Sequence, residues 1–232
     1  MVLIGAMNKW WKLFGVGVLA VTLAGCAIDY PKPYDYSAYK QSNPKSILVL
    51  PPKNMSLDVK ATYSFYSHTQ RPLAEAGYYV LPITLVDEIF KSNGLTLAHD
   101  IHNVSIQKLY DIFGADAVMY IEVKEYGTEF MIFDSVSTVT AEATLVDLRT
   151  GAMLWQGQAT ASSAEDEDKS NQDGLASRLL GAVINQILST TFDQSHEIAK
   201  MTSERLLTPR VYHERIHQDG ILYGPRSRLY KK

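Results

Sequence analysis

The alternation of apolar and polar positions predicts a series of short strands in the middle of the chain. Residues 47–50 form a continuous apolar run that ends at two prolines, which is typical of a strand buried on both faces. From residue 137 to 147, apolar and polar side chains alternate, so this strand is expected to present one face to a core and the other to solvent. The predicted strands lie at 47–50, 78–81, 117–126, 137–147 and 153–162.

Apolar residues spaced three or four positions apart predict helices between and after these strands. Residues 174–192 carry two apolar rows, so this helix is expected to be buried between layers, and it continues or restarts through residue 207. Ser105 and Gly114 are typical of the first and last positions of a helix over 106–113. Further helices are predicted at 59–70 and 85–92, and a short turn headed by Pro72 is predicted at 73–76.

The order of these elements predicts an α/β fold with a mixed sheet and helices packed on it. Early strand–helix units favour parallel pairing, and the later run of strands favours an antiparallel meander followed by a long C-terminal helix.

The N-terminus has the pattern of a secretory leader. Lys9 and Lys12 precede an apolar stretch of twelve residues at 13–24, which is too short to span a bilayer. The stretch ends in Leu23, Ala24, Gly25 and Cys26, which resembles the lipobox of bacterial lipoproteins. The Cys26 thiol is the group that would take a diacylglyceryl chain. A plain signal peptide and a buried N-terminal helix are the alternatives.

A lipidated Cys26 would anchor the protein to a membrane through its acyl chains, palmitate among them. By the sorting rule of such lipoproteins, Asp after the cysteine favours retention in the inner membrane. The residue here is Ala27, so the outer membrane is expected, with the protein body in the periplasm or at the cell surface.

The sequence therefore predicts four parts, with a signal peptide over 1–25 and a lipidated cysteine with an extended tether over 26–44. A globular α/β domain follows over 45–208, and a polar C-terminal tail covers 209–232. The tether prediction depends on prolines and tyrosines without apolar periodicity. Its alternative is that the tyrosines pack on the domain.

Composition narrows the function classes. Of 232 residues, 46% are hydrophobic and 20% are charged, which is typical of a globular protein, and the net charge of -3 argues against nucleic-acid binding. Cys26 is the one cysteine, so an intramolecular disulfide and a cysteine-rich zinc site are excluded.

Several stretches of the chain resemble a family of bacterial outer-membrane lipoproteins with a domain of unknown function. They are SILVLPPKN (46–54), PLAEAGYYVLP (72–82), LVDEIFKSNGL (85–95), IFGADAVMYI (112–121), TAEATLVDLRTGAMLWQG (140–157) and VINQI (183–187). The resemblance implies a domain similar to the N-terminal domain of TolB and to the periplasmic part of CsgG. It implies neither an enzymatic activity nor catalytic residues, and related genes often sit beside a pore lipoprotein of the CsgG class.

One string has a catalytic pattern: His213, Glu214 and His217 match H-E-x-x-H. On a helix, this spacing places two imidazoles one turn apart for zinc, with the glutamate as general base. Pro209 and Gly220 leave room for about two turns without an apolar stripe, so a polar surface tail is the preferred interpretation. Zinc hydrolysis and adventitious metal binding remain the alternatives.

Other candidate features have ordinary structural explanations. His99, Asp100 and His102 are expected in a loop before Ser105, and the acidic run 165–168 lacks the spaced ligands of a calcium loop. Trp155 is expected to anchor the sheet core rather than bind sugar. A basic C-terminal end is formed by Arg226, Arg228, Lys231 and Lys232. An aromatic set suited to a glycan pocket is formed by Tyr63, Phe65, Tyr66, Tyr78 and Tyr79.

These observations predict a lipid-anchored, non-enzymatic envelope protein without a cofactor, an accessory or scaffold for a secretion, surface-assembly or transport system. The expected partners are the membrane, envelope proteins such as a CsgG-like pore lipoprotein, and further copies of the chain in a homodimer or larger homo-oligomer. The two alternatives are a zinc-dependent hydrolase that uses 213–217 and a periplasmic binder of small molecules or glycans.

Overall fold

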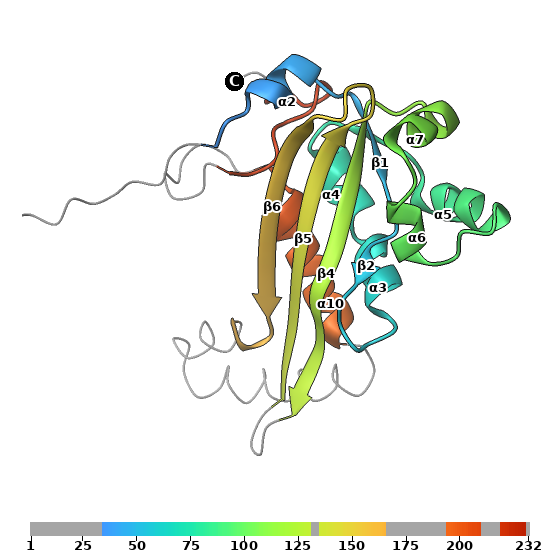
Figure 1. Cartoon of the computed structure of the whole chain (residues 1–232). Helices are drawn as coiled ribbons and strands as arrows, with labels where there is room; N and C mark the ends of the chain where they lie inside the picture. Colours follow the sequence, from blue (N-terminus) through green and yellow to red (C-terminus); the bar gives the residue numbers. More distant parts are fainter. Residues whose placement is uncertain (1–33, 131–134, 166–193, 210–218, 231–232) are drawn as a thin grey trace, which may run out of the picture. The chain divides into compact units, whose positions relative to one another are not determined.

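The computed structural model describes residues 34–130, 135–165, 194–209 and 219–230. These residues form a sheet with strand order β3-β1-β4-β5-β6, and β2 pairs with β4 off this path (Figure 1). The strands are β1 (Ser46–Val49), β2 (Lys53–Asn54), β3 (Tyr79–Val80), β4 (Ala117–Phe130), β5 (Ser135–Asp147) and β6 (Met153–Ser162).

The sheet is mixed, as the sequence predicts. β1 pairs in parallel with β3 and β4, whereas β4, β5 and β6 form the antiparallel meander. β2 continues the parallel pairing with β4 after Pro51 and Pro52 interrupt the strand, because proline has no N–H to donate to a sheet.

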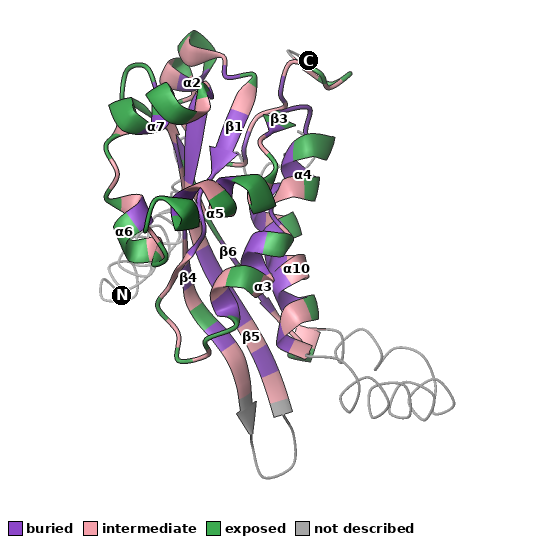
Figure 2. Ribbon diagram, turned by 90° about the vertical axis from the view of Figure 1, so that its right-hand side faces the viewer, coloured by how far each residue is buried: buried purple, intermediate pink, exposed green. Residues whose placement is uncertain are grey.

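Helices cover both faces of the parallel part of the sheet. Ile47 and Val49 of β1 face one core together with Phe65 and Leu73, while Leu48 and Leu50 face a second core. This explains why the whole run is apolar. Figure 2 shows the sheet between two groups of helices. The connection from β2 to β3 contains α3 (Ala61–Ser67) and α4 (Gln70–Glu75). The connection from β3 to β4 contains α5 (Ile83–Ser92), α6 (Ala98–His102) and α7 (Ile106–Phe113).

The antiparallel strands pack against α10 (Gln194–Leu207), the C-terminal helix of the described chain. In β5, Val139, Ala141, Ala143 and Leu145 are all buried, which confirms the predicted period of two. The Ser105 cap of α7 is also confirmed, since its hydroxyl accepts a hydrogen bond from the Lys108 N–H. The predicted helix 174–192 lies outside the described residues.

Residues 34–44 do not form the extended tether that the sequence predicts. They contain α2 (Ser37–Ser42), and Tyr39 is buried with its hydroxyl 2.6 Å from the Tyr78 hydroxyl. The helix ends at Asn43, which has a φ of 47° and whose N–H bonds to the Tyr39 carbonyl. The alternative interpretation, in which tyrosines pack on the domain, therefore holds for this part.

Residues 219–230, the C-terminal segment, also differ from the predicted polar tail. Ile221 is buried in the first core, and the Gly224 and Arg226 N–H groups bond to the carbonyls of Ala76 and Gly77. The Tyr36 hydroxyl donates to the Gly220 carbonyl, which ties α2 to this segment. The short apolar run 221–223 lies between two glycines and has no helix or strand period, so the sequence pattern does not reveal this packing.

Candidate functional site

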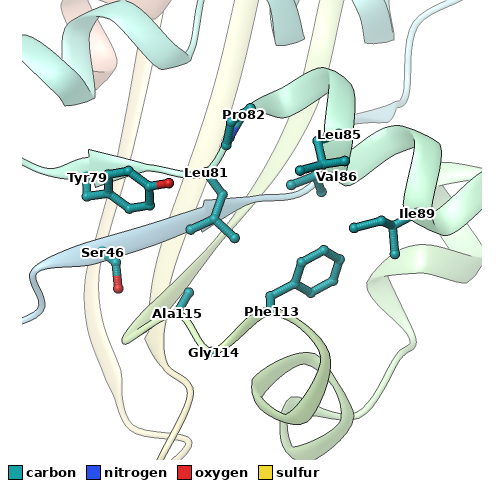
Figure 3. Close-up of a pocket in the computed structure, with 10 residues that line it drawn as sticks. All are labelled: Ser46, Tyr79, Leu81, Pro82, Leu85, Val86, Ile89, Phe113, Gly114 and Ala115. Carbon is teal, nitrogen blue, oxygen red and sulfur yellow. The ribbon is translucent and has the colours of Figure 1, made fainter.

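A pocket of about 410 Å³ opens between the start of β1, the end of β3, and helices α5 and α7 (Figure 3). This volume lies within the range of small-molecule and side-chain binding pockets. Its lining residues are Ser46, Tyr79, Leu81, Pro82, Leu85, Val86, Ile89, Phe113, Gly114 and Ala115.

The local sequence explains why a space remains here. Pro82 turns the chain from β3 into α5, and Gly114 ends α7 with a φ of 60°, a left-handed conformation that suits glycine. Gly114 and Ala115 have too little side chain to fill the gap between the two helices. Val86 and Ala115 are buried, so the pocket is floored by the second core.

The rim of the pocket is apolar and exposed. Leu85 is 56% exposed and Tyr79 is 47% exposed. Exposed apolar side chains around a concave site are typical of a binding surface. The arrangement is therefore suited to hold an apolar group.

The lining carries few ionisable groups. None of the ten residues has a carboxylate, ammonium, guanidinium or imidazole group, and Tyr79 contributes a phenol. The Ser46 hydroxyl already donates to a carboxylate oxygen of Asp116 at 3.0 Å and accepts from the Asp116 N–H at 2.9 Å. The geometry is suited to bind an apolar group at this site.

The candidate zinc site near the C-terminus and the lipobox near the N-terminus lie outside the described residues. This holds for His213, Glu214 and His217 and for the lipobox residues Leu23 to Cys26, so the zinc interpretation and the lipid anchor stay predictions. Within residues 34–130, 135–165, 194–209 and 219–230, no group of three or more histidine, cysteine or acidic side chains is arranged to hold a metal ion. No helix in those ranges is long and apolar enough to cross a membrane.

The histidines at 99 and 102 lie in α6, a helix that replaces the expected loop. The His102 Nε2 lies 2.9 Å from the Pro51 carbonyl oxygen, so this nitrogen carries the hydrogen. Burial lowers the pKa of His102 to about 4, although the hydrogen bond to Pro51 opposes that shift. His102 thus holds α6 against the end of β1.

This pKa predicts a pH dependence of stability. Because the unfolded chain takes up a proton near pH 6.5 and the folded chain resists it until about pH 4, we expect His102 to lower the free energy of unfolding as the pH falls through this window. The variant His102→Gln keeps an N–H donor for Pro51 and should show a shallower loss between pH 6.5 and 4.5 in urea unfolding. Equal slopes for the wild type and His102→Gln would contradict the assignment.

The aromatic glycan pocket that the sequence suggested does not form. Phe65, Tyr66 and Tyr78 are buried in the first core, and of the five aromatic residues only Tyr79 lines the pocket. The reason is that these residues lie on different faces of their helix or strand, so their rings do not point into one common pocket. Trp155, in contrast, anchors the core as predicted, with 1% exposure and its Nε1–H donating to the Asp219 carbonyl at 2.6 Å.

Two of the charged candidates, Glu165 and Arg226, have structural partners. Glu165 forms two hydrogen bonds with Arg205, at 2.6 and 2.8 Å, while residues 166–168 lie outside the described ranges. The Arg226 guanidinium lies 5.5 Å from the Tyr79 ring centre, and Arg228 is exposed. Lys231 and Lys232 are not among the described residues.

Sequence reasoning missed the pocket because each lining residue alone reads as a core position. Leu85 and Ile89 fit the apolar stripe of an amphipathic helix, and only the packing shows that Leu85 is left uncovered. A usable signal was the glycine that ends α7 directly beside an apolar strand, which marks a place where side-chain volume is missing.

Comparison with known proteins fits this architecture. Residues 34–226 match the model of the family described as "Putative lipoprotein GNA1162-like". A protein of Neisseria meningitidis serogroup B, named "Putative lipoprotein NMB1124/NMB1162", is 47% identical over 212 residues, which cover 91% of this chain and 94% of that protein.

Solved structures also align with this chain. The crystal structure of lipoprotein GNA1162 from Neisseria meningitidis is 51% identical, covers 63% of this chain and 99% of that chain, and aligns with a TM-score of 0.50. A PelC dodecamer from Paraburkholderia phytofirmans aligns with 14% identity and a TM-score of 0.40 over 75% of this chain and 91% of that chain. The family model matches more than half of the chain and the Neisseria relative covers 91% of it, so the chain belongs to the GNA1162-like lipoprotein family.

Proposed function

We propose that this lipoprotein is a non-enzymatic scaffold or accessory factor of the cell envelope, which binds proteins through the pocket between α5 and α7. The observation that carries the proposal is an apolar pocket with an exposed apolar rim and no ionisable carboxylate, amine or imidazole in its lining. Such a site can bind an apolar side chain of a partner but supplies no carboxylate, amine or imidazole for general acid–base catalysis.

The location follows from the N-terminal sequence. Acylation of Cys26 would anchor the chain, and Ala27 after it favours the outer membrane. Because the described residues begin at Tyr34, the eight peptide steps from Cys26 span at most about 29 Å, at up to ~3.6 Å per residue. The domain would therefore work close to its membrane, where other lipoproteins such as a CsgG-like pore component or further copies of this chain are concentrated.

In-cell photo-crosslinking tests this proposal. A photoreactive amino acid at Leu85, on the pocket rim, should give a protein adduct that mass spectrometry identifies as an envelope protein or this chain. The same probe at Met153 is the control, because Met153 is exposed on β6 at the other edge of the sheet. The Cys26→Ser variant should lose palmitate labelling, leave the membrane fraction and give less adduct.

Two outcomes would contradict the proposal. One is an equal adduct pattern from Leu85 and Met153, because the pocket would then have no special role in binding. The other is full membrane retention of Cys26→Ser, which would remove the lipid anchor from the argument.

A further inference from the structure

The contact between α3 and α10 contains two histidines that face each other, and we call them the histidine pair. His68 directly follows the last residue of α3, and His196 lies in the first turn of α10. Their ring centres are 4.3 Å apart with the ring planes tilted by 47°, and both residues are half-buried. The two helices lie side by side on one face of the sheet (Figure 2).

Hydrogen bonds join His196 to α3 and to the sheet. The Tyr126 hydroxyl of β4 donates to the Ser64 hydroxyl at 2.9 Å, and the Ser64 hydroxyl lies 2.7 Å from the His196 Nδ1. Because the Ser64 oxygen already accepts from Tyr126, its own hydrogen is available for His196. This chain of donors needs an unprotonated Nδ1 as its last acceptor, and a protonated imidazole has no acceptor nitrogen. An uncharged His196 therefore completes the contact.

His68 has a ring nitrogen that is poorly placed to carry a proton. Its Nε2 is buried and has no hydrogen-bond partner among the residues that the structure describes. A hydrogen on that nitrogen would lose its bonds to water without gaining an acceptor, which costs free energy. The backbone carbonyl of His68 accepts from the Ser203 hydroxyl of α10 at 3.0 Å, so the end of α3 is held at this place. The closed contact therefore favours a neutral His68.

The surrounding charges do not compensate a positive charge on the histidine pair. The charged and titratable groups on the neighbouring elements are Glu197 and Lys200 of α10, Arg71 and Glu75 of α4, and Tyr126 of β4. Glu197 and Lys200 form an ion pair at 3.6 Å, so their charges partly offset each other. Burial, followed by the His196 imidazole, lowers the pKa of His68, and Lys200 adds to this shift, whereas Glu197 and the His196 backbone oppose it.

We infer that the histidine pair is a pH-sensitive contact, which holds α3 against α10 at neutral pH and opens when acid protonates it. Opening lets the rings reach water, where a histidine takes up a proton near pH 6.5. Because the closed form binds that proton less well, each unit of pH below 6.5 favours the open form by up to about tenfold for one proton. Two positive rings at this separation would also repel each other.

The opening is expected to stay local. The second half of α10 remains attached, because the Thr202 hydroxyl donates to the Val139 carbonyl at 3.1 Å and Leu207 is buried in the first core. The histidine pair lies on the face of the sheet opposite the pocket, since α3 packs in the first core and the floor of the pocket belongs to the second. The inference therefore goes beyond the proposed function and does not depend on it.

Hydrogen exchange of the mature protein, purified in detergent, tests the inference. Exchange is measured by mass spectrometry at about pH 7.5 and about pH 5.5, and the rates are corrected for the intrinsic pH dependence of amide exchange. We expect the amides of 65–68 and 198–201 to lose about tenfold in protection at the lower pH, because one proton is taken up on opening.

Three variants identify the group that responds to acid. His68→Leu places an apolar side chain at the buried position, and His196→Gln keeps a polar partner for Ser64 without an ionisable group. Each should remove most of the tenfold loss, and circular dichroism at neutral pH verifies that they fold. His102→Gln is the matched control, because His102 is also a half-buried histidine but bonds to Pro51 beside the second core. It should keep the full loss.

The wild type gives a direct measurement as well. The pH titration of the His68 imidazole carbon signal in nuclear magnetic resonance reports its pKa, which is expected below the ordinary value of 6.5. A pKa at or above 6.5 would overturn the inference, because the closed contact would then bind the proton as well as water does. An acid loss of protection that is unchanged in both His68→Leu and His196→Gln would overturn it too. So would a loss that His102→Gln reduces to the same extent, because these amides would then exchange by global unfolding.

Discussion

Replacing Gly77 with alanine is expected to lower the free energy of unfolding by about 3 kcal/mol, near the upper end of ordinary single substitutions. Gly77 has a φ of +99°, which strains any residue with a side chain. In addition, a Cβ at this position would lie 2.4 Å from the Ser227 backbone nitrogen and 2.9 Å from the Gly224 carbonyl oxygen. The C-terminal segment would have to move away, and the hydrogen bonds of Gly224 and Arg226 would be lost with it.

Gly94→Ala is the matched control for this prediction. Gly94 also has a positive φ, +79°, but a Cβ there has no neighbouring atom within 4 Å. Its cost should be limited to backbone strain of about 1 kcal/mol. Urea unfolding followed by circular dichroism measures both variants, and equal losses would contradict the packing of the C-terminal segment against Gly77.

Replacing Trp155 with alanine is expected to cost about 4 kcal/mol, the usual range for removing a large buried aromatic side chain. The indole is 1% exposed in the first core and lies over Gly157, where a Cβ would meet its ring at 2.3 Å. Its Nε1–H also holds the Asp219 carbonyl, so the variant loses both a core side chain and an attachment of the C-terminal segment.

Met153→Ala on the same strand should change the stability by less than about 0.5 kcal/mol, because Met153 is exposed. Both variants can be measured by the same urea titration. A loss for Trp155→Ala no larger than that for Met153→Ala would show that the indole is not part of the core. In a chain processed at Cys26, Trp155 is also the single tryptophan, so its fluorescence reports on this core in other variants.

The sequence pattern predicts those helices and strands whose side chains pack against a core at regular positions along the whole element. The run 47–50 is apolar at every position because Ile47 and Val49 face one core and Leu48 and Leu50 face the other. The regular alternation in β5 likewise follows from one covered face and one partly solvated face. These local periods were sufficient to predict the mixed sheet.

Contacts between distant parts of the chain could not be predicted in this way. Tyr36 and Gly220 are 184 positions apart, and no local period marks either of them as packed. Tyrosine serves equally well on a solvated tether and in a core contact, because its ring is apolar and its hydroxyl finds a partner. For the same reason, the pocket became visible only when α5 and α7 were placed on the sheet.

Residues 219–230 close the described structure around α2, and this orders the events of folding. The hydroxyl of Tyr78 donates to the Leu222 carbonyl, and Tyr230 bonds to Asn43 at the end of α2. A chain that emerges from its N-terminus, as an exported protein does, lacks these partners until residues 219–230 arrive. The domain is therefore expected to lock only after these residues have been synthesised and exported, and a premature stop before residue 219 should leave a chain that the quality-control proteases of its compartment degrade.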